Sequence, residues 1–424
     1  MPFRIRGAMA PASIFILSVS RLAYSQEPLT RESFVKTVLS GNPSASAARA
    51  LSDEAMAVRS AARLVPDPVV ELSLARARAR DESGSFAGSG PSKSEIGGSI
   101  QQVIPWPGAF RAGIGVAAAE SRGLEISGET LRWELEIDAR QAFDELLFAR
   151  DAVSVARDAE SDARSLLDLT TRKVDVGESR EVDRLKARVE WLKADRGLQT
   201  AVREERASET ILRALVISPL PRPLVLSGEL PMPAADQKVS SPSDLGLKDS
   251  LRYRAAVAEA ERASAQLTSV RRSRMPDVGL TLFRNRELDR EASGAAISLK
   301  VPLWNRNRGE IARAAARAAL STAEANRILL ALTRDAERRF KDLELAVTLA
   351  SISSAEIVSV AERSVALARL AYEHGETSLL DLLDAQRTHR EARRDLLEAR
   401  RAVAMALTEV ERITGPSRPI WSSR

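Results

Sequence analysis

The sequence contains no cysteine, only two histidines and few aromatic residues, which make up 4% of its 424 positions. Without cysteine the chain has no disulfide, no thiolate metal ligand, no thiol nucleophile and no N-terminal cysteine for a lipid anchor. The histidines, His374 and His389, leave little material for imidazole chemistry, and His389 falls on a heptad seam where packing is the expected role. The sequence also offers no nucleotide-binding loop, metal-ligand cluster or nucleophile paired with a base. We therefore predict no enzyme activity, no cofactor and no metal site.

Long apolar runs are absent as well, except near the N-terminus. Arg4 and Arg6 precede a mostly apolar stretch over residues 8–19, and Ala23-Tyr24-Ser25 then offers small residues at the positions that a signal peptidase reads. We predict a cleaved signal peptide over residues 1–25. No run of eighteen apolar residues follows, so the sequence has no candidate transmembrane helix. An exported chain of this kind is periplasmic, secreted or an outer-membrane barrel.

The charge of the chain is large in both signs but nearly balanced. The formal net charge is +5 and the pI is near 9.7, yet arginines alternate with acidic residues along the chain and do not cluster. This pattern is typical of solvated helix faces, and it predicts that nucleic acid is not a partner.

Proline is absent from residues 108–218 and 303–415, and both blocks are rich in helix-forming residues. Such blocks predict long helices, and each is interrupted once, at Val176-Gly177-Glu178-Ser179 and at His374-Gly375-Glu376-Thr377. A glycine followed by Ser or Thr ends one helix and begins the next, so each block is predicted to be a helical hairpin. Apolar residues continue a heptad rhythm along both blocks, as in Leu382, Ala385, Ala392, Leu396, Ala399, Val403, Ala406 and Val410.

Before each helical hairpin, apolar residues recur at every second position, and this alternation predicts a pair of β-strands. The alternating apolar residues are Val70, Leu72 and Leu74, then Ile96, Ile100 and Ile104, and in the second half Val278, Leu280 and Leu282, then Ile297, Leu299 and Val301. Strands of about nine to eleven residues suit a tilted crossing of a bilayer in a barrel wall. The alternative is an ordinary soluble hairpin with one wet face.

These elements occur twice in the same order. Gly177-Glu178-Ser179 with Asp183 lies 198 positions before Gly375-Glu376-Thr377 with Asp381. We therefore divide the chain into the signal peptide, a first repeat over 26–218, a proline-rich linker over 219–247, a second repeat over 248–415 and a tail over 416–424.

Four strands per chain are too few to close a barrel, because spanning barrels need at least about eight strands and lipid does not tolerate open edges. The subunit must then share a barrel with copies of itself. A dimer would supply eight strands and a trimer twelve, and the spacing alone does not choose between them.

The order of elements, the segment Pro105-Trp106-Pro107-Gly108 and above all residues 372–386, which read YEHGETSLLDLLDAQ, resemble the TolC family of outer-membrane efflux proteins. The resemblance covers nearly the whole mature chain. It implies a mostly α fold with a membrane β-barrel portion: a homotrimer with a shared barrel of twelve strands and a periplasmic α-barrel tunnel of coiled-coil hairpins. It also implies an outer-membrane location amid lipid, a periplasmic adaptor and an inner-membrane pump as partners, and passive conduction of substrates to the exterior.

The resemblance also assigns roles to residues. Asp381 and Asp384 match an acidic pair around the periplasmic entrance, and Tyr372 and Asp183 match positions that help to hold this gate shut. The two glycine turns match the tips that meet the adaptor. The chain departs from the family pattern at Glu178 and Glu376, where apolar or small residues are commoner, and at Thr377, which replaces a basic residue.

The residues themselves support the acidic pair in part. Positions three apart share one face of a helix, so in a trimer this pair would gather six carboxylates, whose repulsion would raise some pKa values and favour a bound cation. The simpler interpretation is that Asp381 is an early-turn acid favoured by the helix dipole.

A second function hypothesis is a periplasmic adaptor or coiled-coil structural protein. Such a protein also has a signal peptide and a helical hairpin, but an adaptor has a single hairpin flanked by small β-domains. The sequence does not identify the transported substrate.

Overall fold

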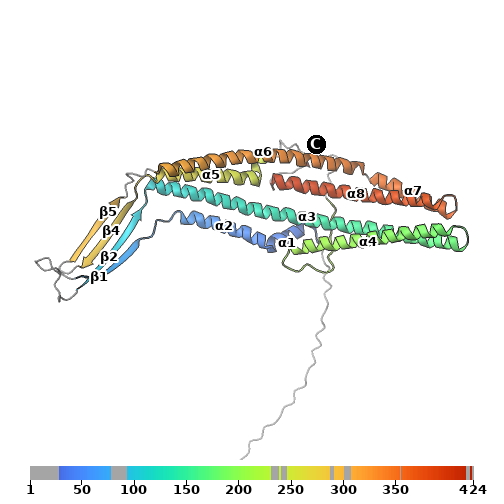
Figure 1. Ribbon diagram of the computed structural model, residues 1–424, viewed down its shortest axis with the longest axis horizontal. Coiled ribbons are helices and arrows are strands. Elements are labelled where there is room, and N and C mark those ends of the chain that lie inside the picture. The colour runs from blue at the N-terminus through green and yellow to red at the C-terminus, as the bar shows by residue number, and fades with distance from the viewer. Residues whose placement is uncertain are drawn as a thin grey trace, which may run out of the picture.

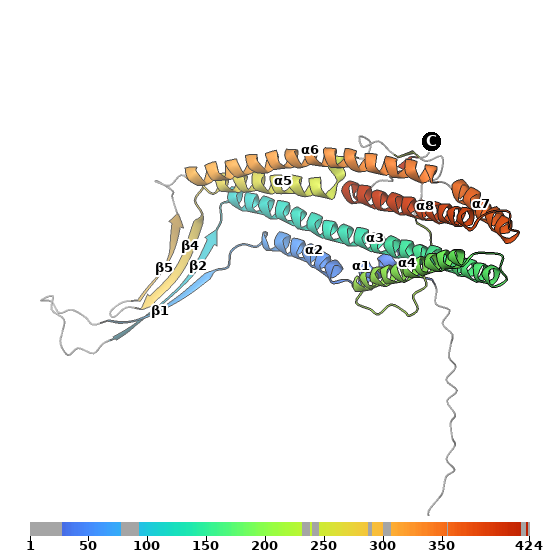
Figure 2. The same ribbon diagram turned by 45° about the vertical axis from the view of Figure 1, so that its right-hand side comes forward.

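The structure is a computed structural model that describes residues 28–77, 93–230, 238–239, 246–286, 291–299, 307–353, 355–416 and 421–422. The predicted signal peptide lies outside these residues. The chain forms an elongated body in which the helices follow the long axis, a four-stranded sheet lies at one end, and the glycine turns that connect the helices lie at the other (Figures 1 and 2). The bounds 26–218 and 248–415 of the two repeats stay a prediction.

The helices are α1 (Arg31–Gly41), α2 (Pro43–Ala61), α3 (Pro107–Asp175), α4 (Glu181–Ala214), the short 3-10 helix η2 (Leu247–Asp249), α5 (Leu251–Arg272), α6 (Arg308–Ile352), α7 (Ala355–Glu373) and α8 (Leu379–Thr414). The strands are β1 (Val69–Ala77), β2 (Lys93–Ile104), β3 (Lys238–Val239), β4 (Val278–Arg286), β5 (Glu291–Leu299) and β6 (Trp421–Ser422). The predicted strand pairs and glycine-ended hairpins are thereby confirmed, while Val301, predicted in the last strand, lies outside the described residues.

The four long strands form one antiparallel sheet in the order β1-β2-β4-β5. Because β4 pairs with β2, the strand pairs of the two halves join side by side, and β1 and β5 are left as open edges. One face of the sheet is apolar and exposed: Leu72, Leu74 and Ile297 keep more than three quarters of their surface accessible. The opposite face carries polar or small residues such as Glu71, Ser99 and Thr281.

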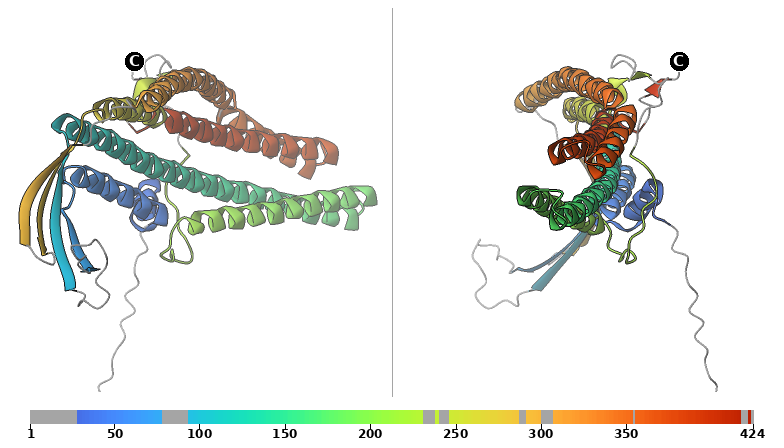
Figure 3. Two further views of the ribbon diagram at one scale, coloured as in Figure 1. Left: turned by 60° about the vertical axis from the view of Figure 1, so that its left-hand side comes forward. Right: turned by 90° about the vertical axis from the view of Figure 1, so that its right-hand side faces the viewer.

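The helices form an open curve and not a compact bundle, as the view along the long axis shows (Figure 3). Near the sheet the packing order is α2-α3-α5-α6, and near the turns it is α4-α3-α8, with α8 packed on α6 and α7. At both levels α3 is an inner member. The outer helices, α2 and α4 on one side and α6 and α7 on the other, each pack on one side only in the described part of the chain.

Two features of the helices depart from simple expectation. Gly113, Gly115, Gly123 and Gly128 predict a weak start to the first long helix, yet α3 runs unbroken over 69 residues. A Cβ at Gly128 would lie 2.9 Å from the Ala48 carbonyl oxygen, so this glycine permits α2 to approach α3 closely.

The second long helix, in contrast, is divided into α6 and α7. The Thr348 and Ser351 hydroxyls donate to the carbonyl oxygens of Glu344 and Thr348, 2.8 and 2.7 Å away. Hydroxyls of Thr130, Thr170 and Thr171 make the same kind of contact within the unbroken α3, so these contacts do not by themselves account for the division. Taken together, α6 and α7 (Arg308–Glu373) also contain, within the described residues, a stretch long and apolar enough to cross a membrane by length and composition, which sequence reasoning did not identify. Its apolar side chains include Leu345, Leu349, Ile357 and Val360, which are exposed at the edge of the curve. We therefore interpret this stretch as a packing surface.

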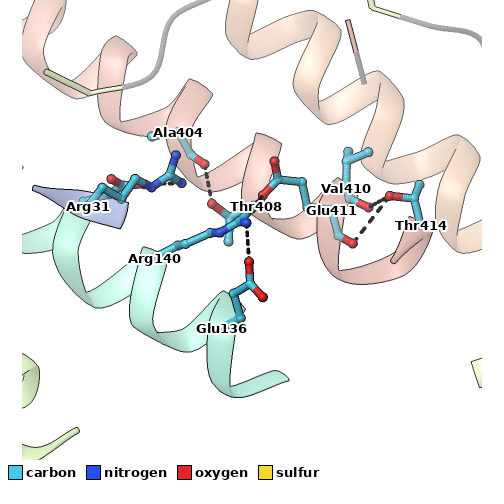
Figure 4. A network of polar contacts seen from close by, with 9 residues as sticks. Arg31, Glu136, Arg140, Ala404, Thr408, Val410, Glu411 and Thr414 are labelled. Atoms are coloured by element: carbon cyan, nitrogen blue, oxygen red, sulfur yellow. Dashed lines mark hydrogen bonds and ion pairs between the residues drawn. The ribbon is translucent and has the colours of Figure 1, made fainter. Parts of the chain in front are cut away.

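Ion pairs join α3 to the antiparallel α8, so charged residues predicted to face solvent partly cross-link helices. The Arg401 guanidinium makes two contacts with the Glu145 carboxylate at 2.7 and 3.0 Å, and Arg393 lies 2.8 Å from Asp158. Arg140 on α3 contacts Glu136 on its own helix and Glu411 on α8, the latter at 3.0 Å (Figure 4). Small seam residues let these helices approach closely enough for the pairs to form.

The Asp144 carboxylate is the least solvated charge in this region, with a side chain only 1% exposed. The Arg31 Nη2 on α1 lies 3.0 Å from its Oδ2, but neither oxygen accepts a hydrogen bond from the described residues. Burial therefore outweighs the attraction of Arg31 and raises the pKa of Asp144 from 3.8 to about 6, with a further upward effect from Glu411 and a downward one from Arg140. The pair anchors α1 on α3 beside the contact of Phe34 with Phe143, whose ring centroids are 6.2 Å apart.

This burial predicts a specific pH dependence. Between pH 3.8 and about pH 6, Asp144 is mostly protonated in the folded chain and mostly ionised in the unfolded chain. The stabilisation of the fold by this proton is therefore complete below pH 3.8 and is lost as the pH rises through the folded pKa. We expect Asp144 to lower the free energy of unfolding by about 1 kcal/mol between pH 5 and pH 8. Urea unfolding in detergent, followed by tryptophan fluorescence, should show this loss in the wild type. It should be absent in Asp144→Asn and present in the control Asp158→Asn, on the same helix but exposed. An equal slope in wild type and Asp144→Asn would contradict the assignment.

Candidate functional site

The two glycine turns lie side by side at the end of the body away from the sheet (Figures 1 and 2). A lysine joins them: the Lys173 Nζ at the end of α3 donates to the Glu373 carbonyl oxygen at the end of α7, 3.0 Å away. The same Nζ lies 3.6 Å from the Glu178 carboxylate and 5.4 Å from the centre of the Tyr372 ring. The turns of the two halves therefore form one surface, which we call the tip surface: residues 176–179 and 374–377.

Both turns have the same backbone geometry. Gly177 and Gly375 adopt φ of 81° and 77°, in the left-handed region. The Glu178 amide donates to the Lys173 carbonyl and the Gly177 amide to the Val174 carbonyl, at 2.8 and 3.0 Å. The Glu376 and Gly375 amides repeat this pattern with Ala371 and Tyr372, at 2.8 and 3.1 Å. This is the Schellman helix end, which requires a residue that tolerates positive φ.

The tip surface is open to solvent. Val176 is 70% exposed. Gly177, Glu178, His374, Gly375 and Glu376 are also exposed, while Ser179 and Thr377 are half-buried. An exposed apolar side chain on an otherwise polar surface is suited to contact with another protein.

Asp381 caps the helix that follows the second turn. Its Oδ2 accepts from the Ser378 hydroxyl, the Thr377 hydroxyl and the Ser378 amide at 2.7, 2.8 and 3.1 Å, and Ser378 completes a capping box. The hydrogen bonds from Ser378 and Thr377 hold the pKa of Asp381 below its ordinary value. Asp384 lies one turn further along α8 and is exposed. Within one subunit, then, Asp381 shows the capping role that sequence reasoning gave as the simpler interpretation, and Asp384 faces solvent.

Asp183 and Tyr372 are both buried in one subunit, with exposed fractions of 8% and 5%. Asp183 caps α4 as Asp381 caps α8: its Oδ2 lies 3.2 Å from the Ser179 hydroxyl and 3.4 Å from the Arg180 amide. Tyr372 packs with Leu166, Ala187, Leu379 and Leu382, and its hydroxyl has no hydrogen-bond partner among the described residues. The two residues thus lie near the same cluster, but no direct hydrogen bond joins them.

Lys173 is the member of this site that sequence reasoning missed. The one available signal was its place in the last turn of a helix, where a basic residue favours the helix dipole and is common. Its contact with the carbonyl of Glu373, 200 positions away, could be recognised only after the two turns were placed together.

Comparison with known proteins places this geometry in a family. The chain matches the family model described as outer membrane efflux protein over residues 34–216 and 245–416. It is 28% identical over 402 residues to the cobalt-zinc-cadmium resistance protein CzcC of Cupriavidus metallidurans, covering 92% of this chain and 90% of that protein.

Solved structures share the fold. The outer membrane protein VceC of Vibrio cholerae superposes with a TM-score of 0.73 at 17% identity, covering 91% of this chain and 96% of that one. The open state of the MtrE outer membrane channel of Neisseria gonorrhoeae gives a TM-score of 0.74 at 19% identity, with 91% and 88% covered.

Proposed function

This chain belongs to the outer membrane efflux protein family, and from that membership we propose that three copies of it close into one passive conduit that completes a tripartite pump. It is an outer-membrane efflux channel with a long periplasmic helical portion, which replaces the hypothesis of a periplasmic adaptor. The family is one of channels, and we infer that this chain catalyses no reaction of its own.

The open edges of the subunit carry the proposal of a homotrimer. β1 and β5 present unpaired backbone groups, which lipid does not tolerate. On the same two sides, the outer helices carry exposed apolar residues at heptad spacing: Val182, Leu185, Val189 and Leu192 on α4, and Ile357, Val360, Leu367 and Leu370 on α7. An arrangement in which the α4 edge of one copy packs on the α7 edge of the next satisfies strands and helices together. Three copies supply twelve strands, enough for an open lumen.

The tip surface is the proposed docking site for a periplasmic adaptor, which in turn contacts an inner-membrane pump. Support comes from its position at the far end from the sheet, its exposure and the rigid Schellman geometry of both turns. A rigid surface loses little conformational entropy when it binds.

The acidic pair is the proposed periplasmic gate, with Tyr372 and Asp183 packed behind it. In a three-fold ring Asp381 and Asp384 would bring six carboxylates to the tunnel entrance, where they would attract cations and hold a multivalent one. The relative named for cobalt, zinc and cadmium resistance supports divalent metal cations as the exported class.

Assembly can be tested by cross-linking, because the natural chain has no cysteine. Leu185 lies in the first turns of α4 and Leu370 in the last turn of α7, so both are close to the tip surface. The detergent-extracted variant Leu185→Cys/Leu370→Cys should form covalent dimers and trimers on oxidation, while each single variant stays mostly monomeric on a denaturing gel. The wild type should run as a trimer in light scattering. A monomer soluble without detergent would contradict the proposal.

The tip turns can be tested through their glycines. Valine at Gly177 or Gly375 must adopt positive φ at a cost of about 1–2 kcal/mol per residue, so each turn should lose its shape. We expect Gly177→Val/Gly375→Val to abolish cobalt, zinc and cadmium tolerance in a host that depends on this channel, with trimer and membrane insertion intact. Asparagine tolerates the left-handed region, so Gly177→Asn/Gly375→Asn should retain most activity. Gly197→Val, in the middle of α4, is the matched control. Wild-type tolerance in the valine double variant would exclude tip docking.

The gate can be tested in planar bilayers. Asparagine preserves the oxygen that accepts the capping hydrogen bonds while removing charge, so Asp381→Asn/Asp384→Asn should lower both cation selectivity and block by divalent or trivalent cations. Asp384→Asn alone should produce only part of the loss, since both carboxylates are exposed and hydrogen bonds hold the pKa of Asp381 below its ordinary value.

Acidification should move the wild-type channel toward the double variant. The lowered pKa of Asp381 keeps that carboxyl ionised to more acidic pH, so the last part of the change requires pH below the ordinary carboxyl range. Asp53→Asn/Asp67→Asn, outside the proposed entrance, is the control. Unchanged block and selectivity in the double variant, with a change in the control, would overturn the gate assignment.

A further inference from the structure

The membrane sheet carries an uneven distribution of charge on its apolar face. The register aligns Val70, Ile100 and Leu282 on this face, and two positions nearer the loops it aligns Leu72 with Arg284. The next aligned set contains Leu74 and Arg286, with Glu291 of β5 beside it. Arg76 of β1 follows at the next outward-facing position. Among the described residues, the charged side chains of this face are thus confined to its loop end.

The exposure pattern identifies this face as the outward one. Along β4 the alternate residues Leu280, Leu282, Arg284 and Arg286 are exposed, while those between them are partly or fully buried. In a barrel the outward face carries the apolar residues and meets lipid. The loop end lies at the opposite end of the sheet from the helices, which in this family extend into the periplasm. The charged residues therefore lie at the level of the outer leaflet.

Among the described residues of this face, the three arginines and one glutamate leave a net positive charge. The Arg284 guanidinium makes two contacts with one Glu291 carboxylate oxygen, at 2.7 and 2.9 Å. Arg286 makes a weaker contact, with its Nη2 3.9 Å from the other carboxylate oxygen, and its side chain is 72% exposed. One arginine is therefore held in place by an acid, while Arg286 and the exposed Arg76 keep their donors available.

We propose that Arg76, Arg284 and Arg286, which we call the arginine rim, bind the phosphate groups of phosphorylated glycolipid in the outer leaflet. Guanidinium groups match phosphate oxygens with paired hydrogen bonds, and long side chains at the end of an apolar band extend into the headgroup layer. The residues next to the rim on its helix side are apolar and face lipid, so a water-soluble polyanion could not approach the arginines from that side. At the helix end of the sheet, the exposed Trp106 is the type of residue found at the other membrane interface. The rim would thus fix the depth and the orientation of the barrel. This inference rests on the proposed channel.

Binding can be measured on the detergent-purified wild-type protein with bisphosphorylated lipid A, the same lipid A after enzymatic dephosphorylation, and phosphatidylethanolamine as probes, by native mass spectrometry. We expect the wild type to prefer phosphorylated lipid A. The variant Arg76→Gln/Arg284→Gln/Arg286→Gln should bind it at least about tenfold more weakly. The matched control Arg313→Gln/Arg327→Gln/Arg394→Gln removes three exposed helix arginines that also pair with glutamates, and it should bind like the wild type.

Glu291→Gln supplies a test in the opposite direction. It removes the acid that competes for Arg284, so binding of phosphorylated lipid A should strengthen, a result that a folding defect would not produce. Equal affinity of wild type and the rim variant, equal loss in the control, or no preference for the phosphorylated probe would overturn the proposal.

The oligomeric state of the wild type, recorded in the same samples, separates the two proposals. A wild type that is not trimeric would overturn the proposed channel. A loss of lipid binding specific to the rim variant would still support the rim, because the register that builds it lies within one subunit.

Discussion

The open edges of the four-stranded sheet impose the constraint on which the rest of the structure depends. In lipid, the unpaired amides and carbonyls of β1 and β5 would each cost several kcal/mol, so the sheet cannot remain a single unit. A similar constraint acts on the helices outside the membrane. On the same two sides of the subunit, α4 and α7 expose apolar residues at heptad spacing, and these residues favour burial against another helix. In the proposed trimer, one rotation that joins β1 to β5 of the next copy would also join the helical edges. The ring is thereby specified by two kinds of surface at once.

The long α3 helix transmits this geometry from the membrane to the tip surface. It begins directly after β2, packs on α2, α4, α5 and α8, and ends at the first glycine turn. Small residues at its contacts, Gly128 above all, permit close approach, and ion pairs such as Arg401 with Glu145 set its register against α8. Such pairs contribute little stability individually, but a series along two antiparallel helices opposes sliding of one along the other. The buried pair of Arg31 and Asp144 is more costly and ties α1 to the same helix.

The features of this fold that could be predicted are the local ones. Period-two residues predicted all four strands, and the two glycines predicted both turns, because turn chemistry acts over a few positions. The division between α6 and α7 was missed, since residues 346–360 contain neither the proline nor the glycine that commonly marks a helix end. The burial of Asp144 and the bridge by Lys173 depend on partners more than 100 positions away, so the sequence held no pattern for them. The gate role of Asp381, Asp384, Tyr372 and Asp183 stays a prediction. The structure does show that Asp381 caps α8, the role that the sequence analysis gave as the simpler alternative.

The internal duplication separates the acids that cap helices from the other acid of the proposed gate. Asp183 and Asp381 occupy equivalent positions in the two repeats, and both accept hydrogen bonds from the residues that begin the following helix. A role shared by both repeats is the one that every helix beginning at a tight turn requires. The position equivalent to Asp384 in the first repeat is Lys186, so a carboxylate at this position occurs in the second repeat alone. A ring of three subunits would then alternate acidic and basic positions around the entrance. Cation attraction would arise at the α8 helices, and Lys186 on the α4 helices would confine it to them.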